Sequence, residues 1–234
     1  MPFDPRVERW RETAARVSPK GLPVDLVLAS IALESGGAPG ICSSVNACGL
    51  MQVKPSVVIQ YNASNKPIPF ERMRGKSSGE AADQIRIGSW LLAHHLKIMH
   101  KADPVRAPWP AGPLTPWQVM AADLRYSHGG GAFNSLRKGA KKAGYPDTFE
   151  GWRDYQSKER PSWTSEKPFF HAWAVWAAAM DGGGNRKSLL ARYQGPAAAP
   201  PAVTPASKAP AIDRKGGAGV LLALFAFGLF ASTR

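Results

Sequence analysis

The chain has 234 residues, of which 44% are hydrophobic, and a formal net charge of +13. This length and composition allow one core-forming domain with accessory segments. The large excess of positive charge predicts a polyanionic partner, but it excludes none of nucleic acid, anionic lipid and bacterial wall polymer.

The first twenty residues have charges throughout and lack the apolar stretch of a secretory signal peptide, so no export signal is expected there. Hydrophobic residues recur at helical spacing instead, namely Val7, Trp10, Ala14 and Val17. This pattern predicts an amphipathic helix whose role is packing. Pro23 then suits the start of a second helix.

An apolar run extends from Leu28 to Glu34 and is followed directly by Ser35-Gly36-Gly37. Glycines directly after an apolar run predict the end of a helix. A carboxyl group at the end of such a run loses hydration, which favours its protonated form and makes it a proton donor near neutral pH. Glu34 is therefore a candidate general acid. The alternative is a surface glutamate in a frayed last turn.

Cys42 and Cys48 are the only cysteines, and both lie in the loop after Glu34. A single pair at this spacing fits a disulfide that closes a small loop, and two reduced thiols fit equally well. A zinc site is not expected, because no second cysteine pair is present.

The segment from Ser56 to Gly79 contains prolines and several basic residues, and we expect a solvated connection there. A long helix is predicted from Glu80 to His100. One stripe of this helix carries its core-facing residues, which are Ile85, Ser89, Leu92, Leu96 and Met99. His94 and His95 are adjacent and point to different faces of a helix, so no metal site is expected.

Thr115-Pro116-Trp117-Gln118 forms a capping box with proline at the first helical position, which predicts a helix start. This helix brings Tyr126 to a glycine turn, and a basic helix is predicted over 132–143. Residues 145–180 are rich in aromatic side chains. These could form a glycan groove, but the helical spacing of Phe169, Trp173 and Trp176 favours core packing.

Residues 195–215 are dominated by proline and alanine and predict a semi-extended linker. Residues 216–232 follow without a single charge. At about 1.5 Å per residue a helix of this length is at the short limit for crossing a bilayer. We expect it to be a C-terminal transmembrane helix. The alternative is an apolar tail held by another protein.

Four of these stretches resemble the motifs of the lytic transglycosylase family, in the family's order. The first two are Glu34-Ser35-Gly36 and Gly49-Leu50-Met51-Gln52. The others are Asp83-Gln84-Ile85-Arg86-Ile87-Gly88 and the Ala-rich stretch from Ala121 to Gly130. The resemblance covers about residues 20 to 135. Two features depart from the family pattern: the cysteine-containing spacer is long, and Ser127-His128 stands where Tyr-Asn-x-Gly is commoner.

The resemblance implies a mainly α, lysozyme-like α+β fold, with a single helical catalytic domain over residues 1–194. It implies cleavage of peptidoglycan glycan strands between N-acetylmuramic acid and N-acetylglucosamine, with formation of a 1,6-anhydro end. Glu34 would be the catalytic acid and base, and Tyr126 would hydrogen-bond it. Ser35 and Gln52 would contact substrate, and Met51 would line the groove. No metal or cofactor is required.

The location follows from a conflict between substrate and sequence. Peptidoglycan lies outside the cytoplasmic membrane, yet no export signal is expected and the hydrophobic segment is C-terminal. A virus particle resolves this conflict, because it is assembled inside one cell and acts on the wall of the next from outside. We therefore expect a virion-associated or virion-membrane enzyme that acts on the host periplasm or cell wall during phage genome delivery. Other virion proteins would then be further partners.

Two other functions remain open on the sequence alone. A lysozyme-type muramidase would need a second carboxylate, for which Glu71, Glu80 and Asp83 are the nearby candidates. A non-catalytic wall- or nucleic-acid-binding module on a membrane anchor would explain the basic charge equally well. The basic residues are scattered, however, and we find no nucleic-acid-binding motif, so no specific nucleic-acid partner is expected.

Overall fold

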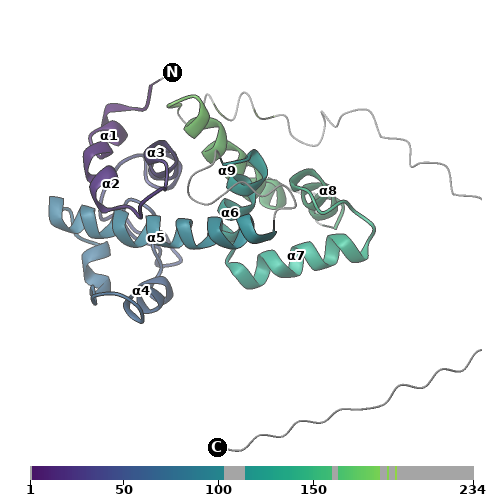
Figure 1. Ribbon diagram of the computed structural model, residues 1–234, viewed down its shortest axis with the longest axis horizontal. Helices are drawn as coiled ribbons and strands as arrows, with labels where there is room; N and C mark the ends of the chain where they lie inside the picture. Colours follow the sequence, from purple (N-terminus) through teal and green to yellow (C-terminus); the bar gives the residue numbers. More distant parts are fainter. Residues whose placement is uncertain (1, 103–113, 160–162, 185–188, 190–192, 194–234) are drawn as a thin grey trace, which may run out of the picture. The chain divides into compact units, whose positions relative to one another are not determined.

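The computed structural model describes residues 2–102, 114–159, 163–184, 189 and 193 (Figure 1). Within these residues the protein is mainly helical. Extended pairing is limited there to two isolated bridges, which join Cys48 to Cys42 and to Val53. The expected mainly α fold is confirmed. The β part of the expected α+β class is wrong for the described residues, because the loop after Glu34 pairs only residue by residue and forms no strand.

The N-terminal segment forms two short helices rather than one, α1 (Pro5–Glu8) and α2 (Arg11–Val17). The break falls at Arg9 and Trp10, whose side chains both donate hydrogen bonds to the carbonyl of Gly37, at 3.1 and 3.0 Å. Val7 and Ala14 are buried, which confirms the packing role. Helix α3 (Val24–Glu34) follows Pro23 and ends at Glu34, as the glycines predict.

The connection expected over 56–79 contains a helix, α4 (Pro55–Asn62), and a 3₁₀ turn, η1 (Phe70–Met73). Val58 and Met73 are buried, so this segment belongs in part to the core. Tyr61 also packs edge-on against Trp90, with 5.5 Å between the ring centroids. The solvated interpretation failed because prolines and basic residues outnumber the few apolar side chains that anchor the segment.

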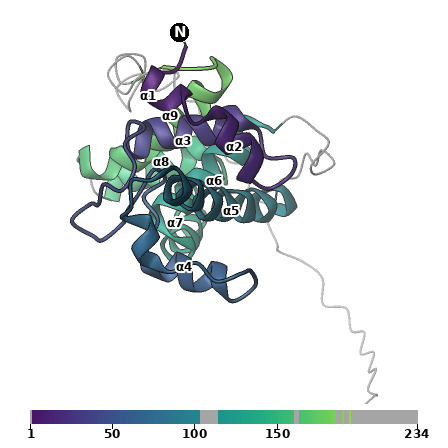
Figure 2. The same ribbon diagram turned by 90° about the vertical axis from the view of Figure 1, so that its left-hand side faces the viewer.

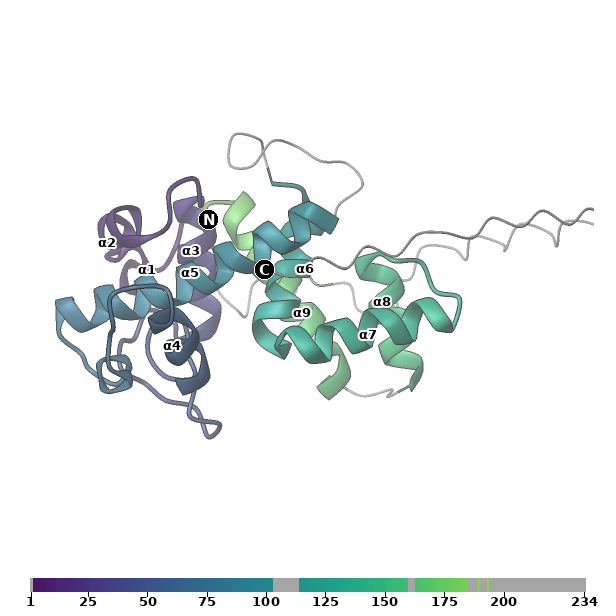
Figure 3. The same ribbon diagram turned by 60° about the horizontal axis from the view of Figure 1, so that its bottom comes forward.

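Helix α5 (Ser78–Ala102) is the long helix expected, and every residue of its predicted stripe is buried. Helices α1, α2 and α4 gather around one end of α5, whereas α7 (Gly130–Lys142) and α8 (Phe149–Glu159) lie beyond its other end (Figures 1 and 3). Viewed toward the end of α5, α4 lies below it, and α5 packs against both α4 and α6 (Figure 2).

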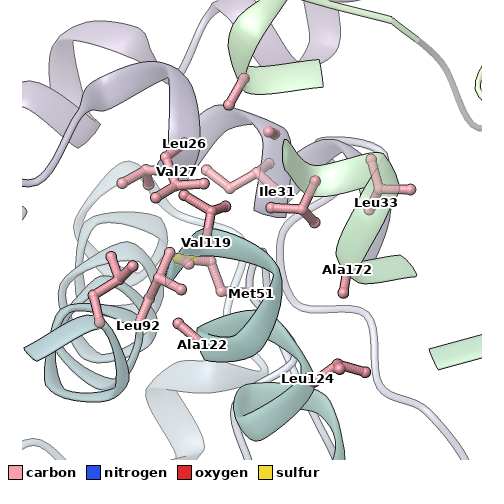
Figure 4. Packing of buried hydrophobic residues seen from close by; sticks show 14 of the residues in the cluster. Leu26, Val27, Ile31, Leu33, Met51, Leu92, Val119, Ala122, Leu124 and Ala172 are labelled. Carbon is pink, nitrogen blue, oxygen red and sulfur yellow. The ribbon is translucent and has the colours of Figure 1, made fainter. Parts of the chain in front are cut away.

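Helix α6 (Pro116–His128) passes through the centre of the core and packs against both α5 and α9 (Trp163–Met180). Its N-terminus has the predicted capping box between Thr115 and Gln118. Figure 4 shows Val119, Ala122 and Leu124 of this helix among side chains from α3, α5 and α9. Small alanine side chains on a buried helix let its neighbours approach closely, so residues of α6 reach the surroundings of Glu34.

Helix α9 packs against α3 as well as α6. Phe169 is fully buried, and Trp173 and Trp176 are half-buried against the core, so core packing is the better interpretation of this aromatic spacing. The helix ends at a glycine turn, where Gly182 has φ +64°.

None of the described helices is long and apolar enough to cross a membrane. The predicted linker (195–215) and transmembrane tail (216–232) lie outside the described residues, so both stay predictions.

Candidate active site

Glu34 is the last residue of α3, and the turn after it is held by the N-terminal helices. Its side chain is 17% exposed. Gly36 and Gly37 have φ values of +59° and +84°. A Cβ atom at Gly37 would lie 2.3 Å from the carbonyl oxygen of Arg6, so the close approach of α1 requires glycine there. The N-terminal helices thus fix the turn that ends α3 at Glu34.

Ser35 is engaged within this turn. Its hydroxyl donates to the carbonyl of Ile31 and accepts from the backbone N–H of Gly37, both at 3.2 Å. Ser35 is also absent from the residues that line the cavity beside Glu34. In this structure Ser35 therefore stabilises the turn, and the substrate contact expected for it stays a prediction.

Glu34 faces a cavity of about 500 Å³. Its walls come from the loop between α3 and α4, from α5, from the end of α6 and from α9. Among the residues that line it are Gln52, Leu91, Tyr126, His128, Lys167 and His171. Glu34 is the only carboxylate among the described lining residues, and Lys54 and Lys167 add positive charge at the rim.

The loop that forms one wall is closed by a disulfide between Cys42 and Cys48, which settles the alternative left open by the sequence. Cys48 exchanges two backbone hydrogen bonds with Val53, at 2.8 and 2.9 Å. Because Ser43, Val45 and Ala47 of the closed loop line the cavity, the disulfide holds part of the cavity wall.

The Gly49–Gln52 turn is held from α5. Gly49 has φ +82°, and a Cβ atom there would lie 2.6 Å from the side chain of Gln84. Gln84 is fully buried and accepts a hydrogen bond from the backbone N–H of Leu50 at 3.0 Å. The glycine and the glutamine of two separate sequence motifs therefore meet. Gln52 has φ +47° and donates to the carbonyls of Ile41 and Gly49, both at 3.1 Å.

Met51 differs from expectation. Its side chain is fully buried and does not line the cavity, so the groove-lining role predicted for it is wrong for this structure. The physical reason is Gly88 of α5, which leaves space that the Met51 side chain fills; a Cβ atom at Gly88 would lie 2.5 Å from the Cβ of Met51. The part of Met51 that serves the site is its backbone carbonyl.

Tyr126, near the end of α6, lines the cavity and donates its hydroxyl proton to the Met51 carbonyl at 2.5 Å. The hydrogen bond expected from Tyr126 to Glu34 is thus replaced by one to the neighbouring loop. Burial and the Glu34 and Asp123 carboxylates raise the pKa of the Tyr126 phenol well above its ordinary value. Tyr126 therefore stays protonated and is held close to Glu34.

The carboxylates proposed from sequence proximity do not reach the cavity. Glu80 is bonded to Ser77 at the start of α5, and Asp83 lies between Arg72 and Arg86. Glu71 is likewise absent from the lining residues.

The structure instead brings two unpredicted residues to Glu34. His171 of α9 lies between two carboxylates, with Nε2 3.5 Å from Oε1 of Glu34 and Nδ1 2.8 Å from Oδ2 of Asp123. Asp123 has a side chain only 2% exposed. A signal for Asp123 was present, because a carboxylate in a run of alanines one turn before Tyr126 faces the same way. His171 carried no such signal within its aromatic surroundings.

A family model, the transglycosylase SLT domain, matches residues 13–146, which is more than half of the chain. None of the curated proteins compared with the chain matches it. The matched range includes Glu34, the disulfide loop, the Gly49–Gln52 turn and Tyr126, and it ends before α9. The chain thus belongs to the transglycosylase SLT domain family, whose activity is lytic transglycosylation of peptidoglycan.

Proposed function

We propose that the protein cleaves the bond between N-acetylmuramic acid and N-acetylglucosamine with Glu34 as its single general acid and base. Peptidoglycan glycan strands are the substrate of the family. The proposal adds the residue that transfers the proton and the product that forms.

In the first step Glu34 donates its proton to the glycosidic oxygen as the bond to muramic acid C1 breaks. The 2-acetamido group of the same sugar stabilises C1. In the second step the C6 hydroxyl oxygen bonds to C1, and its proton goes to Glu34. The net reaction moves one proton from O6 to the leaving oxygen and consumes no water. Glu34 ends in its starting state.

The observation that carries this proposal is that Glu34 is the only carboxylate among the described residues lining the cavity. A hydrolase with two carboxylates needs the second one across the scissile bond, to act as a base or nucleophile. Asp123, the carboxylate next in reach, is 2% exposed and separated from Glu34 by the His171 ring. One accessible carboxylate suits a reaction in which the same group gives and takes the proton.

Mass spectrometry of the products from purified peptidoglycan tests the proposal. We expect 1,6-anhydromuropeptides from the wild-type protein, without new reducing ends. Glu34→Gln should lower turnover by at least about 10²–10⁴-fold because one group serves both steps. Reducing muropeptides would indicate a hydrolase instead. Substantial turnover by a folded Glu34→Gln protein would show that Glu34 is not the general acid and base.

We further propose that the enzyme acts outside the cytoplasm as a virion-associated protein with a C-terminal membrane anchor, opening the wall for phage genome delivery. The disulfide between Cys42 and Cys48 supports an oxidising location, since such bonds persist mainly outside the cytoplasm. The uncharged stretch over 216–232, with Arg214 and Lys215 before it and Arg234 after it, supports a membrane anchor.

Partition with lipid vesicles tests the anchor. We expect the full-length protein to partition with the vesicles, and a protein truncated after Pro196 to stay in the aqueous phase and cleave peptidoglycan at a similar rate. Full-length protein that stays in the aqueous phase without detergent would contradict the anchor, and the virion proposal would lose its main support.

A further inference from the structure

The contact between α9 and Glu34 is the feature that the family match does not cover. His171 is the fourth residue after Lys167 on α9, so both side chains lie on one face of the helix, and both line the cavity. The flanking residues Phe170 and Ala172 are buried, which fixes the backbone at His171. The imidazole is therefore placed by core packing.

We propose that His171, oriented by Asp123, is a positioning residue that holds Glu34 in its proton-donating state. This inference rests on the proposed role of Glu34. Asp123 is almost fully buried and its Oδ2 lies 2.8 Å from Nδ1 of His171, so the ionised carboxylate can accept a hydrogen bond from an Nδ1–H. The proton on Nδ1 leaves the lone pair of neutral His171 on Nε2, which faces Glu34 at 3.5 Å. A protonated Glu34 can then donate a hydrogen bond to this nitrogen.

The arrangement affects both steps of the reaction. Before bond cleavage, the Nε2 lone pair favours the protonated Glu34 that the first step needs. After Glu34 has given its proton away, the remaining carboxylate lies beside an imidazole that is still tied to Asp123, so it keeps its orientation while the C6 hydroxyl approaches. Proton transfer depends on such placement within hydrogen-bond reach.

The pH dependence follows from treating Glu34 and His171 as a coupled pair that holds one proton. That proton is stabilised on Oε1 by a hydrogen bond to Nε2, and on Nε2 by the carboxylates of Glu34 and Asp123. The pair should therefore retain it to higher pH than an isolated carboxyl would. The other titratable groups that face this pair are Tyr126, His128, Lys54 and Lys167.

These other groups do not reverse the expected direction of the pH shift. Tyr126 stays protonated because its pKa is raised. Burial lowers the pKa of His128 despite the opposing influence of Asp123, so His128 is neutral when activity is measured near neutral pH. Lys54 and Lys167 are unchanged in every variant compared. Differences between the wild type and a His171 variant thus report on the Glu34–His171 pair.

The first test is His171→Gln, which keeps a polar side chain but cannot titrate. We expect kcat to fall roughly tenfold or more with little change in KM, and the alkaline limb of the pH–kcat profile to move to lower pH by about one unit or more. His94→Gln is the matched control, because His94 is exposed on α5 and does not line the cavity. A folded His171→Gln protein with wild-type kcat and pH profile would overturn the inference.

The second test is Asp123→Asn, which changes the tautomer rather than the packing. An amide at position 123 can donate to Nδ1, which moves the ring proton to Nε2 and removes the lone pair that faces Glu34. We expect a loss of kcat and a shift of the alkaline limb like those of His171→Gln, and the double variant to be no worse than either single one. Additive losses of kcat would mean that Asp123 acts independently of His171, and would overturn the proposal that Asp123 orients His171.

Nitrogen NMR of ¹⁵N-histidine-labelled protein gives a readout that does not depend on activity. The His171 signals are assigned by their absence from His171→Gln. In neutral His171 we expect the proton on Nδ1 in the wild type and on Nε2 in Asp123→Asn; an unchanged tautomer would overturn the inference. Glu34→Gln separates the two proposals. If Glu34→Gln retains turnover, the proposed role of Glu34 fails. If Glu34→Gln abolishes turnover but His171→Gln leaves kcat and the pH profile unchanged, only the proposed role of His171 fails.

Discussion

The two sides of the cavity are built in different ways. On one side, the loop between α3 and α4 is held by glycines, a disulfide and backbone hydrogen bonds, and it lies within the family match. On the other side, α9 presents Lys167 and His171 from a helix packed against α3 and α6, and it lies outside the match. We refer to these as the loop wall (residues 35–54) and the helix wall (residues 163–180).

The two walls therefore differ in what a substitution is expected to change. The loop wall owes its form to close backbone approaches, so most changes there alter the fold around Glu34. The helix wall owes its form to core packing on the opposite face of α9, so an exposed cavity-facing side chain such as Lys167 can vary with little loss of stability, whereas His171 also partners the buried Asp123 carboxylate. We therefore expect substitutions in the loop wall to act mainly on folding, and those in the helix wall mainly on catalysis and binding.

The sharpest contrast within the loop wall is between Gly37 and its neighbour Gly36. Both have positive φ, but a Cβ atom at Gly37 meets the Arg6 carbonyl at 2.3 Å, whereas one at Gly36 has nothing within 4 Å. We expect Gly37→Ala to lower the free energy of unfolding by about 3 kcal/mol or more, and Gly36→Ala by about 1–2 kcal/mol. Urea unfolding of both variants measures this, and equal losses would show that α1 does not clamp the turn.

The disulfide gives the next largest effect. Replacing Cys42 and Cys48 together by serine removes the cross-link from a loop of about seven residues, which is expected to cost about 2 kcal/mol of folding free energy. Because the closed loop lines the cavity, kcat/KM should fall as well, and adding reductant to the wild type should reproduce that fall. Retained stability and activity in the double variant would mean that backbone bonds alone shape the loop wall.

The sequence predicted the loop wall better than the helix wall, for physical reasons. Glycines after a carboxylate at a helix end leave a local pattern that indicated Glu34, and the resemblance to family motifs indicated Gln52 and Tyr126; all three line the cavity. The Met51 role was wrong because the fit of its side chain against Gly88 is a contact between distant segments. His171 lies far along the chain from Glu34, and only the packing of α9 against α3 brings them together, so local spacing carried no trace of the contact.

The same reasoning applies to the fold. The regular amphipathic period predicted α5 to within about two residues of each end, and the capping box predicted the start of α6. The break between α1 and α2 was missed because it depends on hydrogen bonds from Arg9 and Trp10 to Gly37. Helix α4 was missed because only a few of its side chains are buried.

The smallest predicted effect tests the helix wall away from His171. Lys167 is exposed, lines the cavity and lies one turn before His171. Peptidoglycan carries carboxylates on its peptide stems, and an exposed charge pair contributes about 0.2–1 kcal/mol, so Lys167→Ala should raise KM roughly 1.5- to 5-fold. The free energy of unfolding and kcat should remain near wild type, because no core contact is lost.

Lys138→Ala is the matched control, since it removes the same charge from an exposed position on α7 that does not line the cavity. The two variants should respond differently to salt. The KM difference between Lys167→Ala and the wild type should shrink as ionic strength rises, because screening weakens exposed charge pairs. Equal KM changes in both variants would mean that the overall positive charge attracts the substrate. A large loss of stability in Lys167→Ala would contradict the expectation that substitutions in the helix wall act mainly on catalysis and binding.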